Sequence, residues 1–458
     1  MNLSNNRLCG VWVEYGTRKG NYITEGINAI ADALRVNGAL TSLELRGNQL
    51  GDKGWGAIFA AICGNKDSKI TSLDASSENI GPVGGNAVAA MVAVTGALTA
   101  LDLSLNDLHD DGVSAVCEAI QSNKETKLVS LNMGANSIGP VGAKSVAAMA
   151  AVTGGLTALD LSSNDLKDEG VCAVCKAIQS NKETKLASLN FKNNSISPGG
   201  ANALAAMVAV TGVLTMLSLA RNRLGEEGTK AICEALEQNK SLKEIDISGA
   251  GNHTGIGGSA GAKHVANMLG VNGSLTSVKL RGNTLGDEGW GAIFAAICGN
   301  KDSKIMSMDA SDENIGPVGV KLIAESLRTS VTGALTSINL SKNRLTNFGG
   351  DMTGIKELAA ALGVNGGLTA LDLSFNNLND DSVSAVCEAI QSNKETKLAS
   401  LNMGANSIGP VGAKSVAAMV AVTGTLMECD VSNNAMGEEG KASIRFVAQG
   451  KAGFNLHL

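Results

Sequence analysis

Short segments whose hydrophobic residues alternate with polar ones recur along the chain, and each is followed by a segment with helical periodicity. The segment starting at Leu98 has leucine at positions 1, 4, 6 and 11 (Leu98, Leu101, Leu103 and Leu108) and asparagine at position 9 (Asn106). Side chains two residues apart lie on the same side of a strand. The pattern therefore predicts a short strand whose leucines point into a core.

The residues that follow this strand have the spacing of an amphipathic helix. Within residues 110–123, Val113, Val116, Cys117 and Ile120 occupy positions i, i+3, i+4 and i+7. This apolar face is predicted to cover the leucines of the strand. One strand and one helix cannot bury their apolar faces alone, so neighbouring copies must stack on one another.

The strand motif repeats mostly every 28 or 30 residues, and a partial copy occupies residues 1–8. This periodicity predicts an α/β solenoid of about 15 repeats that forms a single domain over residues 1–458. The motifs begin at Leu40, Ile70, Leu98, Leu128, Leu156, Leu186, Leu214, Leu242, Leu275, Ile305, Leu335, Leu368, Leu398 and Leu426.

The asparagine at position 9 lies where the chain leaves the strand, so its amide is expected to pair with buried backbone groups of the turn. In two repeats one extra residue precedes this asparagine, which predicts a small bulge there. The predicted asparagine ladder consists of Asn48, Asn79, Asn106, Asn136, Asn164, Asn194, Asn222, Asn252, Asn283, Asn314, Asn343, Asn376, Asn406 and Asn434. Asn79 and Asn314 are the two that follow an extra residue.

The repeat length, the phrase LxLSxNxL and the acidic-glycine pairs Asp111-Gly112 and Glu169-Gly170 resemble the ribonuclease-inhibitor-type leucine-rich-repeat family. That family includes ribonuclease inhibitor, the sensor regions of NOD-like receptors and the Ran GTPase-activating protein. The resemblance implies a curved horseshoe, with a parallel β-sheet on its concave side and helices on its convex side. It also implies a protein-binding module, and leaves open a regulator of a small GTPase.

Three insertions between strand and helix depart from the regular spacing, at residues 9–25, 250–262 and 346–353. The first contains Trp12, Tyr15 and Tyr22, and aromatic side chains on a loop are common binding anchors. The alternative is that they fold back and shield the first repeat. Neither terminus has a recognisable cap, so we expect a piece of a longer protein, end-to-end contact with another chain, or a fixed structural subunit of a large assembly.

Position 5 of each strand is expected to face outward on the concave side, and it is acidic in eight repeats. This row predicts a surface for a basic protein partner, although such a row is also compatible with solvated charges. The candidate binding residues are Glu44, Asp74, Asp102, Asp160, Asp246, Asp309, Asp372 and Asp430, together with the aromatic residue Phe375.

Charged residues also differ between the two ends of the predicted helices. Acidic pairs such as Asp110 and Asp111 precede the helices, and lysine pairs such as Lys124 and Lys127 follow them. Both placements complement the helix dipole. They predict an acidic rim, which carries the insertions, and a basic rim.

The composition argues against several classes of partner and of function. With 43 acidic and 37 basic residues the net charge is −6, which argues against nucleic acid or an anionic membrane as partner. No apolar stretch of about 18 residues and no signal peptide is seen, which favours the cytoplasm. The nine cysteines are interpreted as reduced core residues, including Cys172 and Cys175. With four scattered histidines and no metal or cofactor motif, we expect a non-enzymatic protein-interaction scaffold without cofactors.

Overall fold

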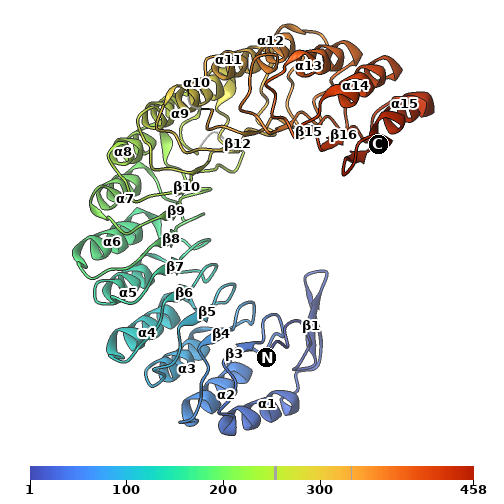
Figure 1. Ribbon diagram of the computed structural model, residues 1–458. Helices are drawn as coiled ribbons and strands as arrows, with labels where there is room; N and C mark the ends of the chain where they lie inside the picture. The colour runs from blue at the N-terminus through green and yellow to red at the C-terminus, as the bar shows by residue number, and fades with distance from the viewer. Residues whose placement is uncertain (252–254, 332) are drawn as a thin grey trace. The chain divides into compact units, whose positions relative to one another are not determined.

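The computed structural model describes residues 1–251, 255–331 and 333–458, in which strands and helices alternate (Figure 1). Residues 1–222 form one compact unit and residues 223–458 form another. Within each unit parallel strands alternate with helices, so the predicted leucine-rich-repeat solenoid is confirmed. The single domain expected over residues 1–458 stays a prediction.

The first unit contains a sheet in which each short parallel strand pairs in register with the next. The helices cover one face of this sheet and leave the other face open (Figure 1). Its strands are β3 (Ser42–Glu44), β4 (Ser72–Asp74), β5 (Ala100–Asp102), β6 (Ser130–Asn132), β7 (Ala158–Asp160), β8 (Ser188–Asn190) and β9 (Met216–Ser218). Its helices are α1 (Glu25–Val36), α2 (Gly51–Gly64), α3 (Pro82–Val92), α4 (His109–Ser122), α5 (Pro140–Ala150), α6 (Lys167–Ser180) and α7 (Pro198–Val210).

The second unit contains one pair of parallel strands and a six-stranded parallel sheet. The pair is β10 (Glu244–Asp246) and β11 (Ser277–Lys279). The sheet consists of β12 (Ser307–Asp309), β13 (Ser337–Asn339), β14 (Ala370–Asp372), β15 (Ser400–Asn402), β16 (Glu428–Asp430) and β17 (Asn455–His457). The helices are α8 (Gly225–Glu237), α9 (Gly258–Leu269), α10 (Gly286–Gly299), α11 (Pro317–Arg328), α12 (Thr353–Leu362), α13 (Asp380–Ser392), α14 (Pro410–Val422) and α15 (Gly437–Gln449).

The core is built from the residues that the hydrophobic pattern predicts. In the repeat of β5 the middle residue Leu101 is buried, and its neighbours Ala100 and Asp102 are half-buried on the open face. Helix α4 buries Val113, Val116, Cys117 and Ile120, together with Gly112. Each large apolar side chain removed from water stabilises the fold by about 1.5–3 kcal/mol.

The position-9 asparagines connect each repeat to the one before it. Asn106 is 5% exposed, and its Oδ1 accepts the backbone N–H groups of Glu78 and Ile80 at 3.0 Å each. Its Nδ2 donates to the carbonyl oxygens of Ala75 and Leu103 at 2.9 Å each. One side chain thus satisfies four backbone groups that the turns leave without partners. Asn252 lies outside the described residues.

The ladder prediction is wrong at two positions, and no bulge forms at either of them. In the repeat of β4, position 9 is Glu78, whose carboxylate accepts the backbone N–H groups of Asn48 and Leu50 at 2.6 and 2.7 Å. Asn79 is the next residue and is exposed. The sheet pairing continues regularly past β4, because the N–H of Ala75 donates to the carbonyl of Asp102 at 2.9 Å.

The second copy of this repeat is arranged in the same way, with Glu313 at position 9 in place of Asn314. The Glu313 carboxylate accepts the backbone N–H of Gly282 and, at 3.4 Å, the indole N–H of Trp290. Ala310 also continues the pairing, since its N–H donates to the carbonyl of Asn339 at 2.9 Å. A carboxylate has two acceptor oxygens, so it replaces the amide oxygen of asparagine in binding the preceding turn.

A second asparagine ladder, which the sequence reasoning missed, lies where the helices end. Asn65 follows α2 and donates from Nδ2 to the carbonyls of Leu34 and Asn37 at 2.8 Å each. Asn123 and Asn181 make the corresponding bonds after α4 and α6. The signal was present in the sequence, because asparagine precedes lysine after α2, α4, α6, α8, α10 and α13.

Candidate functional site

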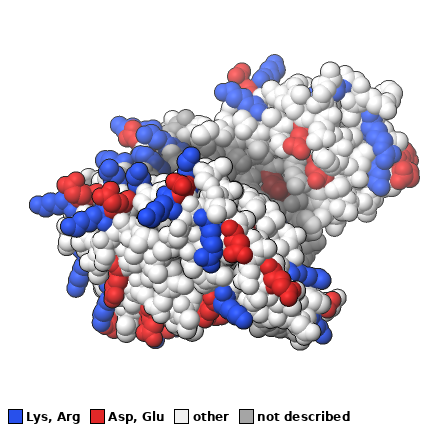
Figure 2. All heavy atoms as spheres, turned by 90° about the horizontal axis from the view of Figure 1, so that it is seen from below, with Lys and Arg blue, Asp and Glu red and all other residues white. Residues whose placement is uncertain are grey.

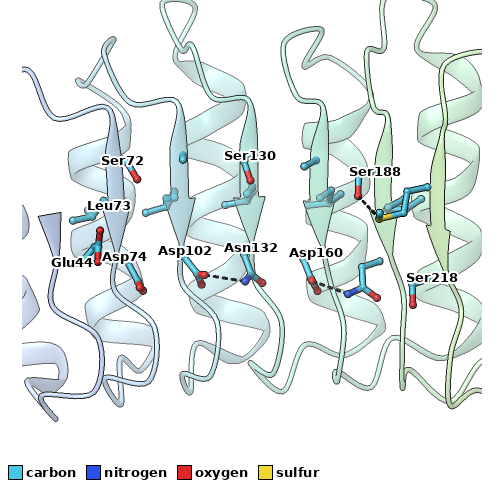
Figure 3. A pocket seen from close by; sticks show the side chains of 18 residues that line it. Glu44, Ser72, Leu73, Asp74, Asp102, Ser130, Asn132, Asp160, Ser188 and Ser218 are labelled. Atoms are coloured by element: carbon cyan, nitrogen blue, oxygen red, sulfur yellow. Dashed lines mark hydrogen bonds between the residues drawn. The ribbon is translucent and has the colours of Figure 1, made fainter. Parts of the chain in front are cut away.

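A groove of about 550 Å³ runs along the open face of the sheet in residues 1–222. Its lining comes from β3 to β9, and Figure 3 shows the position-5 side chains along one side of it. The predicted residues Glu44, Asp74, Asp102 and Asp160 all lie in this lining, beside Asn132. The strands therefore bring together four of the eight predicted acidic residues.

Each aspartate in this row also holds the turn that follows its own strand. Asp102 Oδ1 accepts the backbone N–H of Ser104 at 2.9 Å and its hydroxyl at 2.6 Å. Asp160 Oδ1 accepts the backbone N–H of Ser162 at 2.8 Å. A side chain that accepts the N–H two residues later closes an Asx turn, which explains why a short acidic residue occupies this position.

The second oxygen of these carboxylates faces the neighbouring strand. Asn132 Nδ2 donates to Asp102 Oδ2 at 3.0 Å, and Asn190 Nδ2 donates to Asp160 Oδ2 at 2.7 Å (Figure 3). Adjacent parallel strands lie about 4.8 Å apart, so the alternation of Asp and Asn from β5 to β8 separates like charges that would otherwise repel each other. On β3, β4 and β5 three acidic residues, Glu44, Asp74 and Asp102, are direct neighbours.

The groove has a net negative charge. Its lining contains four carboxylates, and no Lys or Arg belongs to the part of the lining that the structure describes. A concave surface lined by one sign of charge concentrates its field and attracts groups of the opposite sign. The geometry therefore suits a basic group, although the turn bonds already use part of each aspartate's capacity to accept hydrogen bonds.

A smaller groove of about 400 Å³ lies on the open face of the sheet in the second unit. Asp372 and Asp430 line it together with Glu428 and His457, whose Nε2 lies 3.7 Å from Glu428 Oε1. Asp246 and Asp309 are absent from both linings, and each accepts the backbone N–H two residues later at 3.0 Å. The structure thus divides the predicted acidic row instead of gathering it into one site.

Phe375 is exposed beside this second sheet. It is 55% exposed in the turn after β14, with φ of 56°, and Lys342 Nζ lies 5.6 Å from the centre of its ring. This distance is within the range of a cation–π contact. Phe375 remains a candidate anchor for a partner.

The first insertion forms a β-hairpin of β1 (Val11–Glu14) and β2 (Thr17–Gly20). Its three aromatic residues have different surroundings. Tyr22 donates its hydroxyl to the carbonyl of Leu50 at 2.7 Å, and the Arg7 guanidinium lies 4.4 Å from the centre of the half-buried Trp12 ring. Tyr15 is fully exposed at the hairpin tip. Tyr22 and Trp12 thus pack on their own unit, and Tyr15 is available to a partner.

The third insertion exposes a further aromatic residue. Phe348 is 65% exposed with φ of 57°, and Arg344 lies 5.5 Å from the centre of its ring. The sequence reasoning marked this insertion by its length and did not single out Phe348. Of the second insertion, residues 252–254 lie outside the described part of the chain.

The acidic residues that open the helices have a cross-repeat role that the sequence did not reveal. Asp110, at the start of α4, accepts the N–H groups of Gly139 and Gly142 at 2.7 and 3.0 Å, and these residues begin the next helix.

Figure 2 shows one face on which Lys and Arg are interspersed with Asp and Glu. The lysine turns contain acids themselves, as in Lys124-Glu125.

Among the described residues, no group of three or more His, Cys, Asp or Glu side chains is arranged to hold a metal ion. Within the same ranges, no helix has the length and apolar character needed to cross a membrane.

Comparison with known proteins agrees with the repeat geometry. The Leucine Rich repeat family matches residues 39–59, 98–117, 124–147, 156–175, 271–294 and 368–387. Ribonuclease inhibitor of Mus musculus is 27% identical over 417 residues, which cover 90% of this chain and 80% of that protein. These matches support a ribonuclease-inhibitor-type leucine-rich-repeat family.

Other proteins match a smaller part of this leucine-rich-repeat protein in sequence, or share only its fold. NACHT, LRR and PYD domains-containing protein 5 of Bos taurus is 26% identical over 281 residues, 61% of this chain but 24% of that protein. The crystal structure of an internalin from Listeria monocytogenes superposes with a TM-score of 0.50 at 14% identity, covering 89% of this chain and 93% of the internalin. The internalin likeness shows the shared fold alone.

Proposed function

We propose that this leucine-rich-repeat protein is a non-enzymatic scaffold for protein–protein interaction. Its partner binds the open face of the sheet in residues 1–222 and the rim that carries the insertions. The observation that carries this proposal is the groove lined by Glu44, Asp74, Asp102 and Asp160 without a described basic side chain. The relatives include proteins named as inhibitors of ribonuclease, and this supports a protein as the ligand.

The proposed partner presents a basic surface to this groove. Charges of opposite sign raise the rate of association and set the register of two surfaces, and both effects weaken as salt increases. Tyr15 at the hairpin tip is the fully exposed aromatic residue of the insertion in the same unit as the groove. Exposed aromatic residues are typical anchors of binding surfaces.

A cytoplasmic location is also part of the proposal. Seven of the nine cysteines are buried, and they pack as small core residues without disulfides among them. Burial raises the pKa of Cys117 and of Cys233 to about 12, so these thiols stay protonated and unreactive. Fractionation of the native cells tests the location, and recovery in the secreted fraction would contradict it.

A pull-down from the native source tests the groove. The groove variant combines Asp74→Asn, Asp102→Asn and Asp160→Asn. Asparagine removes the negative charge but keeps the Oδ1 atom that closes each turn, so the fold is preserved. We expect a partner that the natural protein captures to be lost or strongly reduced with this variant.

The matched control removes the same number of charges from exposed positions outside the groove. It combines Glu118→Gln, Glu234→Gln and Glu388→Gln, all at exposed residues within α4, α8 and α13, away from the rim that carries the insertions. The control should capture the partner as the natural protein does. Equal recovery by the groove variant and the natural protein would overturn the proposed site.

A further inference from the structure

The turns at the carboxyl ends of the helices form a second edge of the solenoid with a regular surface chemistry. In every second repeat of the first unit an exposed valine lies at the end of the helix or two residues after it, and in the alternate repeats an exposed lysine follows the helix. Val36, Val94 and Val152 are 84%, 62% and 59% exposed. Large aliphatic side chains with this exposure are unusual when they recur along one edge.

The second asparagine ladder fixes each valine next to a lysine. Asn65 donates to the carbonyl of Asn37, the residue after Val36, and Lys66 follows Asn65 directly. Each such bond therefore holds one exposed valine turn against one exposed lysine turn. The arrangement thus depends on bonds from asparagine side chains to backbone carbonyls.

The same bond recurs one and two double repeats later in the first unit. Asn123 donates to the carbonyl of Thr95, and Asn181 donates to that of Thr153. These bonds place Val94 beside Lys124 and Val152 beside Lys182.

The second unit contains two further copies of this couple. Asn300 donates to the carbonyl of Asn272 at 2.9 Å, and Asn393 donates to that of Asn365 at 2.8 Å. The residues before these acceptors are Val271 and Val364, 57% and 64% exposed. Lysine follows the donor asparagine in both copies.

The edge is hollowed between consecutive couples and has unpaired positive charge. A hollow of about 310 Å³ is lined by Lys124 and Val152, so each lysine can have a valine on both sides. Among the described residues, no carboxylate lies within ion-pair distance of Lys66, Lys124 or Lys182. The lysines are therefore free to pair with a ligand.

We propose that this helix-end edge is a second docking surface, which binds an extended acidic protein segment with aliphatic side chains between its carboxylates. The edge offers alternating cations and aliphatic groups, and a segment of this kind complements both. It goes beyond the proposed function, which uses the open face of the sheet.

A protein segment fits the edge better than an anionic membrane. Peripheral membrane surfaces insert Trp, Phe or Leu between lipids, whereas the exposed apolar groups at these couples are valines. Each lysine turn also contains an acidic residue, such as Asp67 or Glu125, which would repel anionic headgroups. A protein segment can place its carboxylates at the lysines and avoid these acids.

Fluorescence anisotropy with labelled synthetic peptides tests the surface on the full-length protein. One probe alternates glutamate and leucine, and a second probe of equal charge and length alternates glutamate and serine. We expect the glutamate–leucine peptide to bind about tenfold more tightly, because only this peptide can cover the valines.

Two edge variants remove the two components of the surface separately. The lysine variant combines Lys66→Gln, Lys124→Gln and Lys182→Gln, and the valine variant combines Val36→Ser, Val94→Ser and Val152→Ser. Each variant should bind the glutamate–leucine peptide about tenfold more weakly than the natural protein.

Two control variants separate this surface from total charge and from the groove. The first combines Lys53→Gln, Lys176→Gln and Lys263→Gln at exposed lysines within helices. The second is the groove variant with asparagine at Asp74, Asp102 and Asp160. Both should bind the glutamate–leucine peptide with an affinity within about twofold of that of the natural protein. This expectation does not depend on whether a partner binds the open face of the sheet.

Three results would overturn the inference. The first is equal binding of the two peptides, and the second is an effect of the lysine variant no larger than that of the control lysine variant. The third is binding to vesicles that contain phosphatidylserine without binding to the glutamate–leucine peptide, which would identify the edge as a membrane surface.

Discussion

At the residue scale, the fold depends on single side chains that satisfy several buried backbone groups at once. Asn106 binds four such groups, one at the end of its own strand and three in the preceding repeat. Water cannot replace a buried side chain of this kind without a cavity large enough to hold it. Asparagine is therefore required here for its paired donor and acceptor, not for its helix or strand propensity.

Replacement of Asn106 by alanine should destabilise the protein strongly. Asn106→Ala leaves four buried backbone groups without partners, and we expect the free energy of unfolding to fall by about 3 kcal/mol or more. Urea denaturation followed by circular dichroism measures the change. Gln121→Ala is the control, because Gln121 is exposed within α4 of the same repeat, and it should change the free energy by less than about 0.5 kcal/mol.

Because Glu78 is part of this ladder, the stability of the protein should depend on pH. Burial raises the pKa of Glu78 from 4.5 to about 7, although the N–H groups of Leu50 and Asn48 act in the opposite direction. The folded state therefore holds a proton between pH 4.5 and 7 that the unfolded state has released. The free energy of unfolding must fall as pH rises through this range, by about 3 kcal/mol at most.

Denaturation of the natural protein and of Glu78→Gln from pH 4 to pH 8 tests this dependence. The loss of stability with rising pH should be smaller in the variant, since glutamine does not titrate. Identical pH profiles for the two proteins would show that the Glu78 pKa is not raised in the folded state.

The sequence predicts the ladder correctly where asparagine holds the ninth position, and its two errors have one cause. The ladder was predicted at Asn79 and Asn314 because they are asparagines, although they occupy position 10 of their repeats. Position 9, counted from Ile70 and Ile305, is Glu78 and Glu313. Whether a buried glutamate can take this role depends on N–H groups of the preceding repeat, and those contacts cannot be read from a single repeat.

At the scale of the element, helices depend on residues of the repeat before them. Asp110 belongs to α4, yet its Oδ1 accepts the first N–H groups of α5, next to Pro140. Proline suits the first turn of a helix, and an acidic acceptor complements the positive end of the helix dipole. The acidic pairs were visible in the sequence, but the helix that they cap was not.

Loss of this helix cap should lower the stability of the protein moderately. Asp110→Ala is expected to lower the free energy of unfolding by about 1 kcal/mol, as other lost helix caps do. The neighbouring Asp111 is exposed, and Asp111→Ala should have a smaller effect on thermal denaturation. Equal effects of the two substitutions would show that the dipole alone, and not the bonds to Gly139 and Gly142, stabilises α5.

The hairpin at residues 11–20 shows how far a pattern can specify an inserted element. Tyr15 and Gly16 both have positive φ, 47° and 74°, as in the tight turns that connect paired strands. The sequence located the insertion and its aromatic residues. It left open which of them packs inward, because the partner of Tyr22 is the carbonyl of Leu50 in the next repeat.

Two tyrosine substitutions in the hairpin should separate stability from binding. Tyr22→Phe removes the bond to Leu50 and should lower the free energy of unfolding by about 1 kcal/mol. Tyr15→Ala should leave stability unchanged and reduce capture of the partner in the pull-down. A loss of stability in Tyr15→Ala without any change in capture would contradict the assignment of Tyr15 to the binding surface.

At the scale of the whole molecule, function depends on surfaces that repeats generate by stacking. A single repeat contributes one aspartate to the open face, and the groove arises only when several strands lie side by side. The sequence could predict this row of residues from the strand register. It could not predict which residues of the row line a groove, since Asp246 and Asp309 are absent from the linings of both described grooves.

The central claim is that the carboxylates of the groove in residues 1–222 bind a basic protein partner. The most direct measurement is the affinity of the captured partner for the natural protein and for the groove variant, between 50 and 300 mM salt. The affinity of the natural protein should fall steeply as salt rises, and that of the variant should be weaker and change less. Identical affinities and identical salt dependence for the two proteins would contradict the claim.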